Sequence, residues 1–173
     1  MSKGHRLFFA LVPDDTIRQQ VEQVQRSLAL VGRAAKPAQF HATLSFLGMQ
    51  PAGLISEIQS IASGLSLRPC RIVMDRFGQF RRAGVAWLGA SEIPQELLEF
   101  QEALVSALLA GGIGHDRKAW KFHITLYRKL RKQGPIMAPV EIEWPVNGFD
   151  LIESVNIGNG VKYSSIGHWN AEQ

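Results

Sequence analysis

A duplicated four-residue motif constrains the fold of this chain more than any other feature of its sequence. A His-Ala-Thr-Leu stretch begins at His41, and a His-Ile-Thr-Leu stretch begins at His123. Each follows a strand pattern and then a helix pattern, so the chain repeats one supersecondary unit. Two copies are too few for a solenoid. We therefore expect two lobes related by a pseudo-twofold axis, with the two motif strands facing each other.

Residue periodicity predicts the remaining elements. Alternating and β-branched runs indicate strands, and apolar residues three and four positions apart indicate helices. Asp14 or Asp15 is suited to cap the first helix, and Pro94 is suited to open the last one. The chain is thus expected to be α+β, with mostly antiparallel sheet and outer helices. Strands are expected over residues 6–12, 40–47, 71–77, 85–88, 122–127, 140–146, 149–156 and 161–169, and helices over 16–31, 54–63 and 94–111.

The size and composition of the chain favour one domain. With 173 residues, 46% of them hydrophobic, it can bury a core, and we expect residues 1–173 to form a single bilobed domain. The single cysteine, Cys70, excludes an internal disulfide framework and fits a reducing, cytoplasmic location. No apolar run approaches the ~20 residues of a membrane helix, so no membrane partner is expected. A monomer is expected, although the composition does not decide the oligomeric state.

Side-chain alternation gives each motif a chemical face. In a strand, His41 and Thr43 share one face, as do His123 and Thr125, while the residues between them point to the core. A histidine with a pKa near ~6.5 gives or takes a proton at neutral pH, so two histidines supply both an acid and a base. Phosphodiester cleavage needs that pair, together with donors such as the two threonine hydroxyls to stabilise charge on the phosphoryl oxygens.

A single His-X-Thr strand is a weak signal, because such a histidine is commonly a surface or structural residue. The duplication favours catalysis, since a structural need seldom demands a titratable group twice in the same register. Rival hydrolases would show other patterns. A metal-dependent enzyme needs clustered ligands such as HExxH, and a serine hydrolase needs a GxSxG elbow; the sequence contains neither.

With these motifs the chain resembles the two-histidine (2H) phosphoesterase superfamily, and within it the RNA 2′,3′-cyclic phosphodiesterases, also called 2′-5′ RNA ligases (LigT-like or ThpR-like). The resemblance spans nearly the whole chain. It implies that the HxT strands line a central cleft and that the reaction needs no metal and no cofactor. Besides both motifs, four stretches look like this family in order and spacing: Arg6–Leu11, Phe46–Gly48, Val85–Gly89 and Gly160–Tyr163.

The resemblance also implies a reaction in RNA processing. Members of this family hydrolyse a terminal 2′,3′-cyclic phosphate to a 2′-phosphate, and in reverse they join RNA ends through a 2′-5′ bond. The expected partners are RNA ends with a 2′,3′-cyclic phosphate or a 2′-phosphate, tRNA fragments among them, or nucleotide cyclic phosphates. Family roles make His41 the proton donor to the leaving 3′-oxygen and His123 the proton acceptor that activates water. The sequence alone does not fix that order.

Two further residues are candidates for substrate binding. Arg128 closes the second motif, and the resemblance implies that its guanidinium clamps the phosphate. By alternation it shares a face with Leu126, unless the strand ends or bends at Tyr127. Phe46 matches a family aromatic that stacks on a base. By alternation it is equally well a core residue.

Charge adds modest support for a nucleic-acid partner. The formal net charge of +4 attracts polyanions only weakly, so the distribution of charge matters more. Basic clusters at 128–132 and 76–82 are candidate contacts to an RNA backbone, although charged runs are usually solvated faces.

Two alternative functions stay open. One is a non-catalytic module of the same fold that binds RNA or a nucleotide, and the intact His and Thr residues in both motifs argue against it. The other is a phosphodiesterase for another cyclic or 2′-5′-linked nucleotide, because the motifs alone do not read the rest of the ligand.

Overall fold

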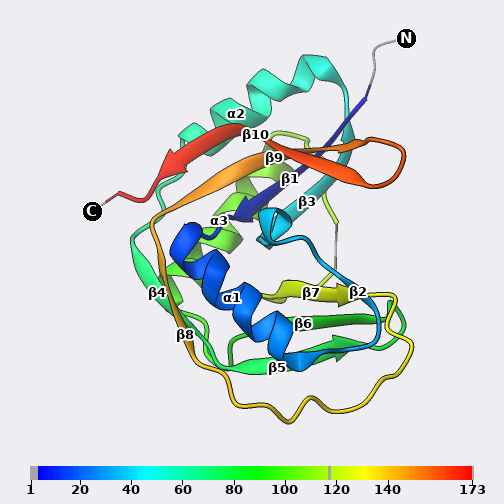
Figure 1. Cartoon of the computed structure of the whole chain (residues 1–173). Coiled ribbons are helices and arrows are strands. Elements are labelled where there is room, and N and C mark those ends of the chain that lie inside the picture. The colour runs from blue at the N-terminus through cyan, green and yellow to red at the C-terminus, as the bar shows by residue number, and fades with distance from the viewer. Residues whose placement is uncertain (1–3, 117, 173) are drawn as a thin grey trace.

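The secondary structure combines three helices with mostly antiparallel strands, which confirms the α+β prediction (Figure 1). The computed structural model describes residues 4–116 and 118–172. Among these residues, no helix is long and apolar enough to cross a membrane. The elements are β1 (His5–Leu11), α1 (Asp15–Leu28), β2 (Arg33–Ala34), β3 (Ala42–Gln50), α2 (Ile55–Ser63), β4 (Cys70–Met74), β5 (Arg76–Phe80), β6 (Val85–Gly89), α3 (Gln95–Ala110), β7 (Ile124–Arg128), β8 (Ile142–Val146), β9 (Gly148–Asn156) and β10 (Val161–Asn170).

One large sheet carries both motif strands. Its order is β10-β9-β1-β3-β7-β6-β5, with β2 beside β7, while β4 and β8 form a separate two-stranded sheet. All of these pairings are antiparallel. The predicted lobes are the two halves of the large sheet, β10-β9-β1-β3 and β7-β6-β5. Within the described residues, β3 and β7 join these halves through a single backbone pair, Ala42 with Ile124.

The two strand-helix-strand repeats, β1-α1-β3 and β6-α3-β7, exchange their helices. Helix α1 of the first repeat lies over the β7-β6-β5 half, whereas α3 of the second repeat packs against β3 and β9 (Figure 1). On that side, the rings of Phe100 in α3 and Phe149 in β9 have centroids 4.7 Å apart. The exchange interlocks the halves, so buried residues from both belong to one continuous core cluster.

Two glutamines tie the exchanged helices to the motif strands. Gln25 of α1 donates from Nε2 to the carbonyl oxygens of Leu126, at 2.8 Å, and of Ala35, at 2.9 Å. Gln101 of α3 donates to the carbonyl oxygen of Leu44 at 3.1 Å. Because Leu44 and Leu126 are the equivalent leucines of the two motifs, the duplication extends to these contacts. Gln25 is buried, which the apolar periodicity of its helix did not reveal.

The first helix is shorter than the predicted range 16–31. It begins as expected, because the carboxylate of Asp14 accepts a hydrogen bond from the backbone N–H of Ile17 at 2.9 Å. It ends at Leu28, since Ala29 adopts the left-handed conformation with a φ of 45°. Val31, which the predicted range included, therefore lies outside the helix, and its side chain is exposed.

The predicted strand over 71–77 is two strands in different sheets. β4 pairs with β8, whereas β5 forms the edge of the large sheet. Asp75 separates them, because its carboxylate accepts from the N–H of Ser91 at 2.8 Å and its own N–H donates to Gly89. A continuous β-favouring run does not show which partner each part will find. The short strand β2 was also not predicted, since its two residues lie in what reads as a connection.

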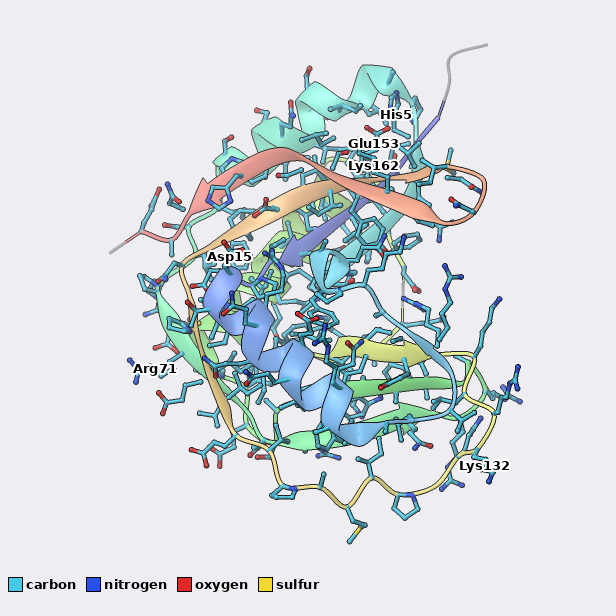
Figure 2. All side chains as sticks on the ribbon, viewed as in Figure 1. His5, Asp15, Arg71, Lys132, Glu153 and Lys162 are labelled. Atoms are coloured by element: carbon cyan, nitrogen blue, oxygen red, sulfur yellow. The ribbon has the colours of Figure 1, made fainter. Side chains whose placement is uncertain are left out.

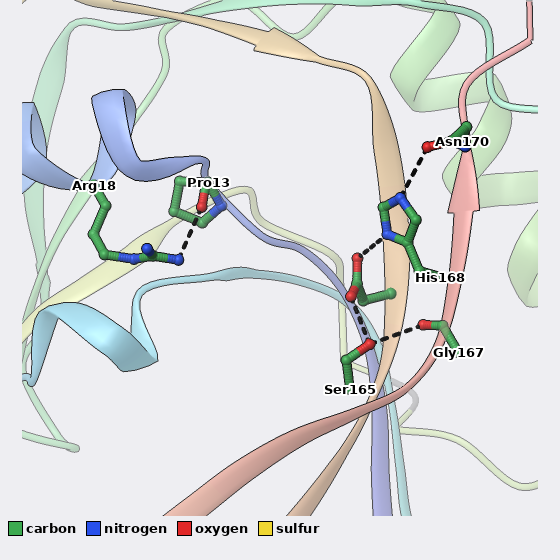
Figure 3. Close-up of polar contacts among 7 residues, drawn as sticks. Pro13, Arg18, Ser165, Gly167, His168 and Asn170 are labelled. Atoms are coloured by element: carbon green, nitrogen blue, oxygen red, sulfur yellow. Dashed lines mark hydrogen bonds and ion pairs between the residues drawn. The ribbon is translucent and has the colours of Figure 1, made fainter.

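Two histidines outside the motifs fasten strand β9 to its neighbours. His5 Nδ1 lies 2.6 Å from a carboxylate oxygen of Glu153 (Figure 2). His168 donates from Nδ1 to Asp150 at 2.8 Å, and its Nε2 lies 2.9 Å from the side-chain oxygen of Asn170 (Figure 3). The hydrogen bond to Asp150 raises the pKa of His168. Both contacts serve the sheet and lie outside the cavities described below.

Replacing Gln25 with leucine is expected to destabilise the fold. The substitution removes the hydrogen bonds to the carbonyls of Ala35 and Leu126, of which the latter keeps the backbone N–H of Ala35 as a donor. Losing the two bonds should cost about 1–3 kcal/mol in the free energy of unfolding. Urea denaturation measures the difference. Gln23→Leu, at an exposed position of the same helix, is the matched control and should stay within about 0.5 kcal/mol of the parent. Equal stability of the two variants would contradict a stabilising role for the hydrogen bonds of Gln25.

Candidate active site

The backbone pair between Ala42 and Ile124 brings the two His-X-Thr segments together. Both paired residues are fully buried in the core. Side chains alternate along a strand, so the flanking histidines and threonines point to the opposite, open face. In an antiparallel ladder the flanking residues also meet crosswise, which sets His41 beside Thr125 and His123 beside Thr43. The prediction that the motif strands face each other is confirmed at this one point.

Each motif histidine is held by the backbone in the same way. Nδ1 of His41 lies 2.8 Å from the carbonyl oxygen of Gln39, and Nδ1 of His123 lies 2.8 Å from that of Lys121. A carbonyl oxygen only accepts, so Nδ1 carries the hydrogen and Nε2 is the basic nitrogen of the neutral ring. Nε2 of His41 lies 3.1 Å from the hydroxyl oxygen of Thr43. Both rings are therefore oriented to exchange a proton through Nε2.

Aromatic side chains wall both imidazoles. The ring centroids of Phe8 and Tyr163 lie 4.9 and 5.3 Å from that of His41. Those of Phe80 and Trp87 lie 4.9 and 6.4 Å from that of His123. These walls remove water from the rings.

The pKa of each motif histidine lies below its ordinary value. Burial is the largest cause for both, because a low-dielectric environment disfavours the imidazolium. The positive charge of Arg128 lowers the pKa of both rings further, whereas the carbonyl hydrogen bonds of Gln39 and Lys121 oppose these effects. Both histidines are consequently biased toward the neutral form, and a bound anion would shift them back.

Both motif strands carry a β-bulge at the same position. Leu44 has no partner on β1, and Leu126 has no partner on β6, although the residues on either side are paired. A bulge adds one residue to a strand and so reverses the alternation beyond it. Each extra leucine is also the residue whose carbonyl accepts from the glutamine of an exchanged helix. The sequence repeat therefore extends to the position of the bulges.

The bulges turn Phe46 and Arg128 toward the open face. They are equivalent residues, each three positions beyond a motif threonine, and both line the same cavity as Thr43 and Thr125. Simple alternation, which placed Arg128 on the face of Leu126, is wrong for this reason. Both interpretations of Phe46 hold in part, since its ring lines the cavity and packs against the buried cluster of Phe8, Ala10 and Ile152. The guanidinium carbon of Arg6 lies 5.0 Å from the ring centroid of Phe46.

Two adjoining cavities cover the open face of the motifs. The first, here called the His41 cavity, has a volume of about 520 Å³ and contains five of the six predicted site residues. The second, the His123 hollow, has a volume of about 870 Å³ and contains His123. Thr43 and Phe46 line both, so the cavities meet between the two histidines. The structure therefore brings the predicted residues together, with His41 in the lining of the first cavity and His123 in the lining of the second.

The sequence did not point to several residues of the His41 cavity. Arg6, Arg33 and Lys36 join Arg128 in its lining, and Tyr163 packs on the imidazole. Arg6 and Tyr163 lie in stretches that resemble the family, which is the one signal that could have identified them.

The predicted basic clusters contribute little to either cavity. From the cluster at 128–132 only Arg128 lines one of them, and Arg76 of the other cluster stacks on Trp87 with 5.9 Å between its guanidinium carbon and the ring centroid. Within the part of the chain that the structure describes, no three His, Cys, Asp or Glu side chains gather as a metal site would require.

Comparison with known proteins places this geometry in a family. The model of the 2′-5′ RNA ligase superfamily matches residues 13–157. The chain belongs to this superfamily. It is 30% identical to the RNA 2′,3′-cyclic phosphodiesterase of Archaeoglobus fulgidus over 153 residues, covering 86% of this chain and 85% of that protein. Against the Escherichia coli protein of the same name, it is 27% identical over 173 residues, with 98% of each chain covered.

Several solved structures share the fold of this chain. The crystal structure of E. coli LigT complexed with 3′-AMP superposes with a TM-score of 0.90 at 26% identity, covering 99% of this chain and all of that one. A crystal structure of a Thermus thermophilus protein gives a TM-score of 0.80 at 26% identity, covering 97% of this chain and all of that one. The MHV ns2 PDE domain, at 18% identity and a TM-score of 0.63, shares the fold alone.

Arg128→Gln is expected to raise the pKa of both His41 and His123. Its guanidinium is the one side-chain charge that lowers the pKa of both rings, so a neutral amide removes that repulsion. NMR titration of the imidazole carbon-bound protons measures the shifts. Arg131→Gln, an exposed member of the same basic run, is the control and should leave both values unchanged. Unchanged titration of the Arg128 variant would show that this guanidinium does not face the histidines.

Proposed function

We propose that this protein is an RNA 2′,3′-cyclic phosphodiesterase that hydrolyses a terminal 2′,3′-cyclic phosphate to a 2′-phosphate. The observation that carries the proposal is the pair of motif histidines, each with Nδ1 bound to a carbonyl and Nε2 directed to one continuous open face. The relatives from A. fulgidus and E. coli carry this name, and each of them aligns with most of this chain. We further propose that residues 1–173 act as one bilobed domain, as a monomer, in the cytoplasm.

The two histidines divide the proton transfers in the proposed mechanism. Nε2 of neutral His123 takes a proton from water, and the water oxygen attacks phosphorus. The bond from phosphorus to the 3′-oxygen breaks, and the imidazolium of His41 protonates that oxygen. The 2′-oxygen keeps the phosphate. Each proton transfer is expected to raise the reaction rate by about 10²- to 10⁴-fold.

The other site residues stabilise and orient the phosphate in this proposal. The hydroxyls of Thr43 and Thr125 donate to the non-bridging oxygens, where negative charge develops. Arg128, re-aimed by the bulge, supplies a charge-assisted contact to the same group. Phe46 lies at the junction of the cavities, where it stacks against a nucleobase. These residues act on the phosphate without any resident cofactor.

RNA ending in a 2′,3′-cyclic phosphate should be converted to the 2′-phosphate, and EDTA should not change the rate. His41→Ala and His123→Ala should each lower kcat by about 10² to 10⁴, because each removes one proton transfer. Chromatography of the products against 2′- and 3′-phosphate standards identifies the isomer. His168→Ala, which alters a histidine outside both cavities, is the control and should retain activity.

Each other outcome of this assay has a defined meaning. A 3′-phosphate product would reverse the leaving-group assignment. Binding without turnover would identify a non-catalytic RNA-binding module, and turnover of only other cyclic or 2′-5′-linked nucleotides would identify a different phosphodiesterase. Inhibition by EDTA would count against the proposed chemistry.

The pH dependence of the reaction follows from the lowered pKa values. Activity requires one protonated and one neutral histidine, so kcat/KM should be bell-shaped, with its maximum midway between the two apparent pKa values. Because both lie below the ordinary value in the free enzyme, the maximum should fall below pH ~6.5. The bound phosphate favours both imidazolium forms, so the kcat profile should lie at higher pH. A kcat/KM maximum on the alkaline side of that value would contradict the assignment.

A further inference from the structure

Gln25 is a buried polar residue that lies outside both cavities and is bonded to the strand that carries Arg128. It belongs to α1, which covers the β7-β6-β5 half of the large sheet, and it is only 4% exposed (Figure 1). Among the described residues that line the His41 cavity and the His123 hollow, Gln25 is absent. A buried amide needs hydrogen-bond partners, because leaving it unpaired costs free energy. Its side-chain partners are carbonyls of β7 and of the segment beside β7.

The amide of Gln25 holds the bulge of β7 from the core side. Its Nε2 donates to the carbonyl oxygens of Leu126, at 2.8 Å, and of Ala35, at 2.9 Å. Strand β6 pairs with Thr125 and Tyr127 but not with Leu126, so this ladder does not fix the extra residue. The N–H of Ala35 also donates to Leu126, at 2.8 Å, but these two residues belong to the same corner of β2 and β7. Gln25 therefore joins this corner, bulge included, to α1.

The corner of β2 and β7 carries two cations of the His41 cavity. Arg33 of β2 is paired with Arg128 of β7, and both side chains line the cavity. Arg128 lies two residues beyond the bulged Leu126, so the direction of its side chain depends on how the bulge is held. A displaced bulge would turn the guanidinium away from the phosphate, and a small misplacement of such a group lowers a rate strongly. The bond from Gln25 to Leu126 therefore sets the aim of Arg128.

The other repeat contains the same arrangement, with Gln101 in place of Gln25. Gln101 donates to the carbonyl oxygen of Leu44, the extra residue of β3, and Phe46 lies two residues beyond it. Gln101 also lines the His123 hollow, so its replacement would change a cavity directly. Gln25 lines neither cavity, and its replacement therefore separates the positioning of Arg128 from direct contact with the substrate.

We propose that Gln25 is a positioning residue of the active site, because it holds the bulge that aims Arg128 into the His41 cavity. The inference rests on the proposed function, in which Arg128 contacts the phosphate. Gln25 touches neither the phosphate nor a motif histidine, so its whole effect on the reaction passes through Arg128. Replacing Gln25 should therefore slow the reaction only while Arg128 is present, whereas it should weaken the fold in either case.

A double-mutant cycle between Gln25 and Arg128 tests this dependence. Gln25→Leu should lower kcat/KM for RNA ending in a 2′,3′-cyclic phosphate by about 10-fold, and Arg128→Gln by about 10- to 10²-fold. In the Arg128→Gln background, Gln25→Leu should lower kcat/KM by less than about twofold, because the group that it aims is already gone. The free energy of unfolding, measured in urea, should instead fall by the same amount in both backgrounds. A merely structural role would slow the reaction equally in both.

The pKa values of the motif histidines give a second readout, which does not require turnover. When the guanidinium of Arg128 turns away, the pKa of both His41 and His123 should rise, in the direction expected for Arg128→Gln. Tyr127→Phe is the matched control, because it removes the 2.8 Å hydrogen bond from the Tyr127 hydroxyl to the backbone carbonyl of Gln25 and leaves the amide in place. It should lower stability, keep both pKa values, and keep kcat/KM within about twofold of the parent.

A second variant, Gln25→Met, keeps the length of the side chain without its amide and serves in every measurement if Gln25→Leu does not fold. The inference is overturned if folded Gln25 variants keep the kcat/KM of the parent, if they lower it equally with and without Arg128, or if Tyr127→Phe lowers it as much. A parent that hydrolyses no cyclic phosphate overturns the proposed function instead. The positioning of Arg128 is then decided by the imidazole pKa values, and unchanged values in the Gln25 variants would overturn it too.

Discussion

The backbone pair between Ala42 and Ile124 is the contact on which the rest of the site depends. It is the point where the two halves of the large sheet meet, and it sets the distance and orientation of the motifs that flank it. Ala42 and Ile124 are apolar and fully buried. Because side chains alternate along a strand, the histidines and threonines beside them lie on the opposite face. The exchanged helices hold this junction closed from the core side, since each one binds the motif strand of the other repeat.

The two bulges explain how Phe46 and Arg128 reach the open face of the sheet. In a regular strand, Phe46 and Arg128 would lie on the buried face together with Leu44 and Leu126. The extra leucine in each motif reverses the alternation, so a cation and an aromatic ring join the open face while the leucine itself stays buried. The carbonyl freed at each bulge is bonded by Gln25 or Gln101, which lets the irregular backbone persist inside the core.

The sequence predicted the faces of strand residues correctly where the two-residue repeat of a strand holds, and it could not predict them beyond a bulge. His41, Thr43, His123 and Thr125 follow the two-residue repeat of a strand, so their common face could be predicted. The bulges depend on pairing with β1 and β6, which a single sequence does not display, so the faces of Phe46 and Arg128 could not. Two other features needed knowledge of packing across the halves. Both the buried position of Gln25 and the exchange of helices involve partners distant in the chain.

The duplicated backbone gives both histidines the same tautomer, so their roles must be separated by what surrounds them. Burial and the charge of Arg128 lower the pKa of both rings; in addition, the charge of Lys121 lowers the pKa of His123, and the charge of His123 lowers that of His41. The ammonium of Lys121, with Nζ 4.5 Å from the ring centroid of Trp87, favours the neutral form of His123. A neutral imidazole is what a general base requires. Burial is the largest cause for both rings and the charge of His123 also lowers the pKa of His41, so the assignment of donor and acceptor rests on which product isomer forms.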